Sequence, residues 1–426
     1  MSVIGKITRI WKLKDLRNKI LFVFVMLVIF RFAAHVPIPG VNIENLKNLF
    51  ESSQFLGLLN VFSGGALSNF SVVMLGVAPY ITSSIIFQLL TMIVPRLQEI
   101  SKDGEAGQKK INKWQRWLSV PLALAQSYAT ISLLQKTGQG IIGDMSMIQY
   151  ISAILTITGG CVFLMWIGEL ITEKSIGNGI SLIIFAGIIA AIPTSLQQTV
   201  TTYDSSRLPE IIVFLAIALI TVVGVVVINE ARRNIPVNYA RQIRGNKMYG
   251  GTSTHLPLKV NQAGVIPIIF AISFVLFPPL VAQFFASSSV GWVATGANFV
   301  ATIFNNPYFY ASFYFILVVA FTYFYTAVIF KPDEISENLQ KQGAFIPGIR
   351  PGQPTAEYLN NTSQRILLTG ALFLGIIAVL PYTMQSFGTV QTMVVGGTSL
   401  LIVVSVVIDT VKQVESQLTM RDYEGF

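Results

Sequence analysis

The residues of this chain that could do chemistry are few, and none of them forms a catalytic or metal-binding pattern. Cys161 is the single cysteine and lies inside an apolar run, where a lone thiol behaves as a small core residue. His35 and His255 lie far apart, without a neighbouring Cys, Asp or Glu at metal-ligand spacing. The sequence contains no P-loop, no HExxH and no GxSxG motif. We therefore predict no metal site, no cofactor and no enzymatic activity.

Ionisable residues within the apolar runs are equally scarce, and this bears on the class of transport. The main ones are Arg31, Glu169 and Asp409, all close to predicted helix ends. A secondary transporter for ions or small polar solutes is expected to hold several ionisable residues near mid-membrane, paired and facing inward. Their scarcity favours a channel over such a transporter and is compatible with a pore whose constriction is apolar. Any energy source would then be external.

The elements that must position these residues are membrane-spanning helices. Of the 426 residues, 53% are hydrophobic and 12% are charged, which is roughly half the charge of a typical soluble domain. A helix of about 20 apolar residues spans the hydrocarbon core of a bilayer. Ten such runs occur, at Ile20–Val36, Leu75–Val94, Trp117–Leu134, Ile148–Ile171, Ile180–Leu196, Ile211–Ile228, Gly264–Phe285, Tyr310–Phe330, Ile366–Pro381 and Met393–Val411. The sequence predicts an all-α integral membrane protein with ten transmembrane helices.

The basic residues predict that both termini lie in the cytoplasm. Ten crossings place both ends on one side, and cytoplasmic segments carry an excess of Lys and Arg. All of the 29 basic residues fall on that side except four, which are Lys47, Lys136, Arg207 and, within the first helix, Arg31. The net charge of +9 is therefore a topology signal first. The basic segment 1–19 resembles a signal peptide only superficially, because Pro37–Gly40 replaces a cleavage site, and we expect a retained first helix.

Two cytoplasmic segments are longer than a helix connection needs, namely Asn229–Asn261 and Lys331–Arg365. Both mix basic residues with turn residues. A solvated loop remains one interpretation, and a docking surface for a large partner is favoured because loops of this length are often functional. The expected organisation is a cytoplasmic segment 1–19, an N-terminal half 20–196, a C-terminal half 211–411 and a cytoplasmic tail 412–426.

A shorter apolar segment, Phe55–Phe70, cannot span a bilayer and is broken at Ser63–Gly65. It must either re-enter the membrane shielded by protein or lie in a cavity, since lipid leaves irregular backbone unsatisfied. An external loop with an apolar patch is the alternative. Two pairs of apolar residues four apart, Val77 with Ile81 and Ile180 with Ile184, share helix faces. Their spacing alone does not separate them from ordinary packed residues.

The most distinctive motifs of the sequence are, in chain order, Pro37–Gly40, Phe62–Leu67, Ser71–Leu90, Met165–Ser181, Ser253–Asn261, Gly343–Gly352 and Gly396–Ile402. In the same order they resemble motifs of the SecY family, whose members are the central subunits of protein translocons. Ser71–Leu90 resembles the family's second-helix signature, and Met165–Ser181 resembles its junction between the fourth and fifth helices. The resemblance covers the chain from the first helix to the last and is of the bacterial or organellar type.

The resemblance implies two inverted five-helix halves around an hourglass pore, with a short plug helix at about residues 55–69. It implies a lateral gate between the second and third helices and the seventh and eighth, with Gln88 and Asn261 as polar latch residues. The plug positions are Phe62, Ser63, Gly64, Gly65, Ala66 and Leu67. The six apolar positions that match the pore ring are Val77, Ile81, Ile180, Ile184, Ile269 and Ile402.

The implied function is a protein-conducting channel in the bacterial inner (plasma) membrane. It would pass unfolded secretory proteins across the bilayer and release transmembrane segments laterally, driven by SecA or the ribosome. Implied partners are the SecE and SecG subunits, the SecA motor ATPase, the ribosome with its rRNA, signal peptides, nascent chains and membrane lipids. The residues expected at the motor and ribosome docking surface are Arg232, Arg233, Arg241, Arg244 and Arg350.

Overall fold

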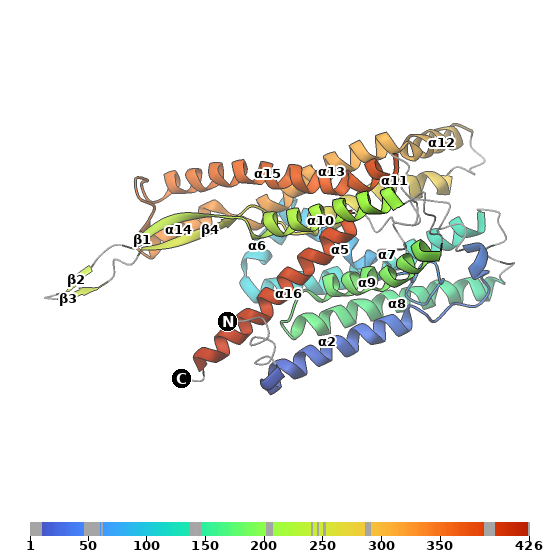
Figure 1. Cartoon of the computed structure of the whole chain (residues 1–426), viewed down its shortest axis with the longest axis horizontal. Coiled ribbons are helices and arrows are strands. Elements are labelled where there is room, and N and C mark those ends of the chain that lie inside the picture. The colour runs from blue at the N-terminus through green and yellow to red at the C-terminus, as the bar shows by residue number, and fades with distance from the viewer. Residues whose placement is uncertain are drawn as a thin grey trace.

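The computed structural model describes residues 11–46, 60, 63–136, 141, 143, 146–201, 208–239, 242–244, 247–249, 253–285, 291–386 and 397–424. Within this part of the chain, every predicted apolar run lies on a helix. These ten helices are α2 (Lys14–Ala33), α5 (Ala78–Ile93), α7 (Gly104–Lys136), α8 (Met147–Glu173), α9 (Gly179–Thr201), α10 (Leu208–Glu230), α11 (Ile266–Phe285), α13 (Pro307–Ile329), α15 (Gln353–Ser386) and α16 (Gly397–Glu424). They form an elongated bundle (Figure 1).

Membrane-spanning capacity follows from helix length and apolar composition. Among the described residues, five helices are long and apolar enough to cross a membrane, and a sixth span results if the bent pair α5 and α6 (Pro95–Lys102) counts as one. The pair bends by 103° at Val94. Helices α9 and α11 contribute shorter apolar stretches, at Gly179–Pro193 and Ile266–Val275. The fold is an α-helical membrane protein, and the count of ten crossings remains a prediction.

Several helices extend beyond the predicted apolar runs. Helix α7 begins at Gly104, α15 begins at Gln353, and α16 continues to Glu424, so that much of the expected tail 412–426 is helical. A further helix, α12 (Gly291–Asn305), lies in what the sequence predicts as a connection. Hydropathy marks only the part of a helix that contacts lipid, whereas polar residues with good helix propensity continue the same helix into water.

The two long segments predicted as loops contain regular structure and form one body. Strand β1 (Arg232–Tyr239) pairs antiparallel with β4 (Ser253–Lys259), and its end pairs with β5 (Ala344–Phe345) from the second segment. The sheet order is β4-β1-β5. Strands β2 (Gln242–Arg244) and β3 (Lys247–Tyr249) form a separate two-stranded ribbon, and α14 (Pro332–Lys341) precedes β5.

A small apolar core holds these cytoplasmic elements together. Inward-facing Ile235 and Val237 of β1 pack with Leu258, Ile346 and Leu359. The alternate residues Asn234 and Pro236 are exposed, as the two-residue period of a strand requires. The sheet projects from one end of the bundle, and the described ends of the chain, at the start of α2 and the end of α16, lie toward that same end (Figure 1).

The main core lies between the two halves of the chain. Its buried side chains come from α2, α8 and α9 of the N-terminal half and from α10, α11, α13, α15 and α16 of the C-terminal half. Close helix packing is made possible by glycines: a Cβ on Gly160 of α8 would lie 1.9 Å from the Val72 carbonyl oxygen, and one on Gly179 would lie 1.8 Å from the Gly168 oxygen. Small residues serve the same purpose at helix contacts in membranes generally.

Candidate pore, plug and docking surface

The six predicted ring residues belong to the main core between the two halves. Val77 directly precedes α5, Ile184 lies on α9, Ile269 on α11 and Ile402 on α16, and all four are at most 8% exposed. Ile81 and Ile180, one helical turn from Val77 and Ile184, are partly buried and pack against the same cluster. The structure therefore brings together positions far apart in sequence. Their role as a pore ring remains a prediction.

The segment Ser63–Phe70, which overlaps the predicted plug 55–69, is largely buried and is held by hydrogen bonds within the segment and to Asn60. Phe62 lies outside the described residues. The Ser63 hydroxyl accepts from the Leu67 amide at 3.1 Å, and the Asn60 side-chain oxygen accepts from the Ser68 amide at 2.9 Å. Ala66 and Leu67 are at most 5% exposed. This segment therefore packs inside the protein, and its role as a plug remains a prediction.

This segment and α9 approach each other closely at two glycines, Gly64 of the segment and Gly187 of α9. Gly64 and Gly65 have φ of +69° and +80°, a conformation that glycine adopts without steric cost. A Cβ on Gly64 would lie 2.6 Å from the Gly187 Cα, and a Cβ on Gly187 would lie 2.8 Å from the Gly64 Cα. Backbone meets backbone here, so neither position has room for a side chain. Gly187 lies three residues after Ile184 on α9, so the contact with Gly64 is about one helical turn from this predicted ring position.

The predicted latch residues Gln88 and Asn261 are not hydrogen-bonded to each other. The Asn261 amide nitrogen donates to the Asn229 side-chain oxygen at 2.7 Å and to the Gly264 carbonyl at 3.2 Å. The Gln88 and Asn261 side-chain oxygens are buried and accept no hydrogen bond. Asn229 in turn donates to the Ser405 hydroxyl at 2.6 Å. Asn261 therefore belongs to a polar network that joins α10 and α16 to the start of α11.

The faces of α5 and α11 that the predicted lateral gate would use lie in contact. Ile85 of α5 packs with Phe270 of α11 and Tyr325 of α13, and Ile81 and Leu89 pack against this cluster. Phe270 meets Tyr325 edge-on, with ring centroids 5.8 Å apart. The contact is apolar and consists of separate side chains, with no ladder of backbone hydrogen bonds, so it can separate without breaking secondary structure.

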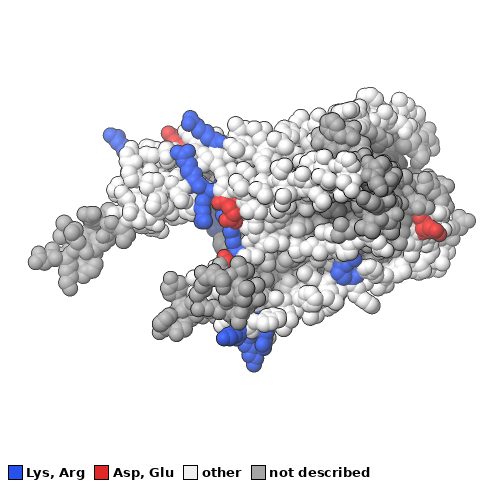
Figure 2. Space-filling model, viewed as in Figure 1, with Lys and Arg blue, Asp and Glu red and all other residues white. Residues whose placement is uncertain are grey.

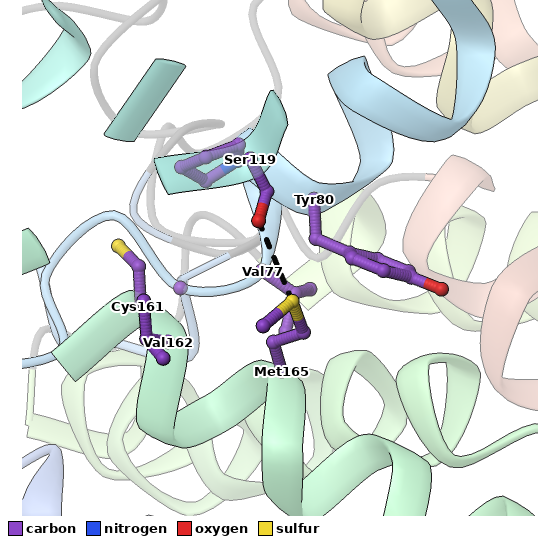
Figure 3. A pocket seen from close by; sticks show the side chains of 8 residues that line it. Val77, Tyr80, Ser119, Cys161, Val162 and Met165 are labelled. Carbon is purple, nitrogen blue, oxygen red and sulfur yellow. Dashed lines mark hydrogen bonds between the residues drawn. The ribbon is translucent and has the colours of Figure 1, made fainter. Parts of the chain in front are cut away.

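A small cavity lies beside Val77, where α7 and α8 pack against the start of α5 (Figure 3). Tyr80, Ser119, Cys161 and Met165 are among its lining residues, and the Ser119 hydroxyl lies 3.4 Å from the Met165 sulfur. The buried position of Cys161 agrees with its interpretation as a core residue. Among the described residues, no group of three or more His, Cys, Asp or Glu side chains is placed to hold a metal ion.

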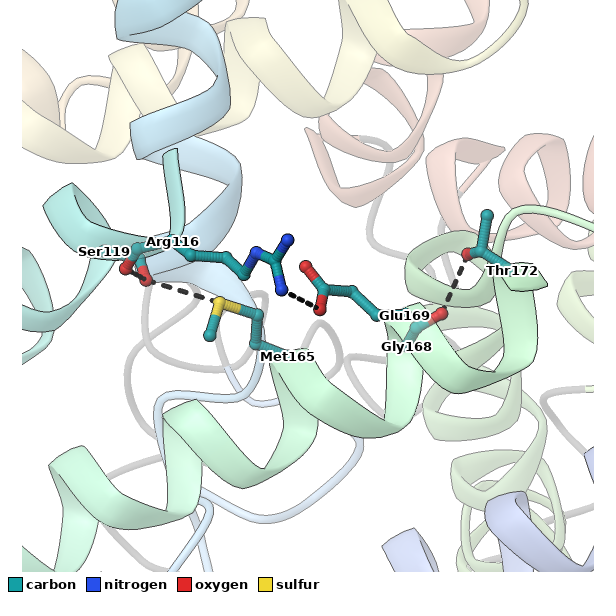
Figure 4. A network of polar contacts seen from close by, with 6 residues as sticks. All are labelled: Arg116, Ser119, Met165, Gly168, Glu169 and Thr172. Carbon is teal, nitrogen blue, oxygen red and sulfur yellow. Dashed lines mark hydrogen bonds and ion pairs between the residues drawn. The ribbon is translucent and has the colours of Figure 1, made fainter. Parts of the chain in front are cut away.

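One ion pair between α7 and α8 was missed by sequence reasoning. The Arg116 guanidinium donates to Glu169 at 3.1 Å, next to the Ser119–Met165 contact (Figure 4). Glu169 was identified as an ionisable residue near a helix end, and Arg116 as a basic residue in the preceding cytoplasmic segment. The spacing of 53 residues gives no sign that the two side chains meet. The pair joins two neighbouring helices and has no catalytic geometry.

The predicted docking arginines are only partly described. Arg232, Arg233 and Arg350 are exposed, the first two on β1. Arg244 lies on β2, and Arg241 lies outside the described residues. Lys259 of β4 pairs directly with Arg232, which places two exposed cations side by side on the sheet. Figure 2 shows most of the visible Lys and Arg side chains toward the end of the molecule that carries this sheet.

The fold is shared with solved membrane channels that conduct proteins. A solved structure described as a protein-conducting channel matches with a TM-score of 0.63 at 16% identity, covering 93% of this chain and 91% of that one. Sec61 from the canine ribosome-channel complex of the endoplasmic reticulum matches with a TM-score of 0.60 at 15% identity, again covering 93% and 91%.

The sequence comparison identifies the family. The SecY family model matches residues 71–411. The chain is 46% identical to the protein translocase subunit SecY of Mycobacterium bovis, over 97% of each chain, and 43% identical to that of Streptomyces galbus, over 98% of each. The chain belongs to the SecY family.

Proposed function

We propose that this chain is the pore-forming subunit of a Sec protein translocase. It passes unfolded secretory proteins across the membrane and releases transmembrane segments laterally into the bilayer. The observation that carries the proposal is a single apolar cluster that contains Val77, Ile184, Ile269 and Ile402. These residues come from the position just before α5 and from α9, α11 and α16, and so from both halves of the chain. The names of the bacterial relatives, protein translocase subunits, point to the same activity.

The chemistry of this cluster suits a seal that opens for a polypeptide. Methyl-rich walls offer no hydrogen bonds to water or ions, so a narrow apolar constriction blocks conduction by dewetting. The same side chains deform around many passing residues without binding any of them strongly. The Ser63–Phe70 segment packs against α9 beside this cluster and forms a second barrier.

Lateral release requires a side opening, for which the apolar contact between α5 and α11 is suited. A hydrophobic signal peptide or transmembrane segment can replace these side-chain contacts with equivalent ones at little cost in free energy. The side-chain oxygens of Gln88 and Asn261 lack hydrogen bonds in this structure. A chain that passes through the opening could donate hydrogen bonds to them.

The docking surface consists of the sheet β4-β1-β5 with its exposed cations and Arg350. Because β5 pairs with β1, both long cytoplasmic segments present one rigid surface to a partner. Positive charge on this surface suits the phosphate backbone of ribosomal RNA, and a matching solved channel was determined in a ribosome-channel complex. SecA is the alternative driving partner, SecE and SecG are the expected subunits, and the bacterial plasma membrane, with both termini cytoplasmic, is the expected location.

The test is reconstitution of the chain with SecE in liposomes, followed by addition of SecA, ATP and a secretory precursor. We expect the precursor to become protected from external protease, and we expect protection to require ATP. A precursor that stays fully degraded, in vesicles where the chain is folded and SecA is bound, would refute the proposed function. Uptake of a small solute driven by an ion gradient would instead indicate a secondary transporter.

Replacing Arg350 with glutamate is expected to impair motor-driven translocation while the variant protein still inserts into the membrane. Arg350 is exposed in the connection between β5 and α15, so the change reverses a charge on the docking surface without disturbing the core. The loss should be about tenfold in initial rate, the factor that corresponds to ~1.4 kcal/mol. The measurement is protease protection of a precursor with SecA and ATP. Arg96→Glu, an exposed charge reversal on α6 and outside both long segments, is the control, and equal rates for the two variants would contradict the assignment.

A further inference from the structure

Arg31 is a charged residue in the last turn of an otherwise apolar stretch of α2, and its side chain hydrogen-bonds to the Ser63–Phe70 segment. Its guanidinium Nη1 donates a hydrogen bond to the Gly64 carbonyl oxygen at 2.6 Å. Among the described residues, no carboxylate forms an ion pair with Arg31. Because a cation inside a membrane is expensive and usually serves a function, this contact calls for an explanation.

Within the described residues, the Gly64 carbonyl accepts its hydrogen bond from Arg31 and not from the turn around it. The neighbouring carbonyls of Ser63, Gly65 and Ala66 accept hydrogen bonds from nearby residues of the same stretch, which are Ala66, Ser68 and Ser71. Gly64 instead directs its oxygen out of the segment toward α2. A hydrogen bond from a guanidinium is charge-assisted and stronger than one between neutral groups.

The same residue is held on its other sides by packing. The Cβ position of Gly64 is closed by the Gly187 Cα at 2.6 Å and by the Phe30 ring at 3.3 Å. Phe30 precedes Arg31 on α2 and is 2% exposed. Gly64 is therefore enclosed by two consecutive residues of α2 and by the backbone of α9.

We infer that Arg31 is a positioning residue that holds the Ser63–Phe70 segment against α9 through the Gly64 carbonyl. The inference rests on the proposed function for its consequence, since displacement of this segment matters only in a channel. The segment cannot leave α9 until the guanidinium and the Gly64 oxygen separate. Arg31 thereby sets how readily the channel opens, without touching the translocating chain.

The test measures the exposure of the segment directly. In a Cys161→Ala background, Leu67→Cys places a thiol at a position that is 5% exposed. Arg31→Gln removes the charge-assisted hydrogen bond, and we expect the rate of labelling by a water-soluble maleimide to rise about tenfold in the reconstituted complex. Resting ion conductance in planar bilayers should rise in parallel. Arg17→Gln, which removes a positive charge from the same helix far from the segment, should behave as the unsubstituted chain.

The labelling experiment tests the role of Arg31, and the translocation assay tests the proposed function, so the two can fail independently. Unchanged labelling and conductance in folded Arg31→Gln would overturn the role of Arg31, even if the unsubstituted chain translocates a precursor with SecA and ATP. Should Arg31→Gln fail to accumulate, Arg31→Lys keeps the charge and topology signal but lacks the length and fork of the guanidinium. Labelling of Arg31→Lys at the unsubstituted rate would then overturn the inference, and faster labelling would support it.

Discussion

Ile184→Gly is expected to make the resting channel leak ions, with an increase in conductance of about tenfold, equivalent to lowering the barrier by ~1.4 kcal/mol. Ile184 is 2% exposed and lies in the cluster that unites both halves of the chain. Removing its branched side chain widens the apolar constriction and leaves backbone groups that water can hydrate, so dewetting no longer blocks conduction. The measurement is single-channel or ensemble conductance of the reconstituted complex in planar bilayers without a precursor.

The matched control lies on the same helix. Ile189 is 40% exposed and faces away from the cluster, so Ile189→Gly carries the same helix-propensity cost of about 1 kcal/mol without changing the constriction. We expect Ile189→Gly to conduct as the unsubstituted chain does. Ile81→Gly, at the partly buried ring position on α5, should leak as Ile184→Gly does. Equal conductance for Ile184→Gly and Ile189→Gly would show that Ile184 does not line the barrier.

The helices could be predicted from the sequence because hydropathy is a local property. Each apolar run is long enough to predict a helix from its length and composition alone, and every one of the ten lies on a helix. Helix ends could not be located in the same way. The polar residues before Trp117 and after Val411 continue α7 and α16 into water, and no hydropathy signal marks where such a helix stops.

The sequence of β1 contains a pattern that predicts a strand. In β1 the residues Ile235 and Val237 alternate with Asn234, Pro236 and Asn238, and large apolar residues at every second position are typical of a strand with one buried face. The pairing of β1 with β5 had no such signal, because it joins segments from two different cytoplasmic loops. Contacts of this kind depend on the fold as a whole and cannot be read from either segment alone.

At the candidate site too, contacts within one helix could be predicted from the sequence, and contacts between distant segments could not. The pairs Val77 with Ile81 and Ile180 with Ile184 share helix faces by their spacing, but only the resemblance to a family separated them from ordinary packed residues. The contacts of Arg31 and Gly187 with Gly64 join segments that no periodicity connects. Arg31 was identified as an ionisable residue within the first helix, and its partner was visible only in three dimensions.

Gly187→Ala is expected to displace the Ser63–Phe70 segment, because the new Cβ would lie 2.8 Å from the Gly64 Cα and 3.2 Å from its amide nitrogen. Both are backbone atoms, so no side-chain rotation relieves the clash. Alanine in a helix is otherwise favoured over glycine by about 1 kcal/mol. Helix α9 itself should therefore fold at least as well, and the cost falls on the contact with the segment. Labelling of Leu67→Cys and resting conductance should both rise by about tenfold.

Gly159→Ala of α8, where an added Cβ meets nothing within 4 Å, is the control and should label and conduct as the unsubstituted chain. If Gly187→Ala also labels and conducts as the unsubstituted chain does, the contact between Gly64 and Gly187 does not hold the segment in place. Combining Gly187→Ala with Arg31→Gln tests whether both act on one equilibrium between a bound and a displaced segment. Both residues contact Gly64, so their free-energy effects on this equilibrium are coupled and do not simply add. The labelling rate of the double variant should therefore rise by no more than the product of the two single increases. A double variant that exceeds this limit would require a second opening, at a place other than the contact between Gly64 and α9.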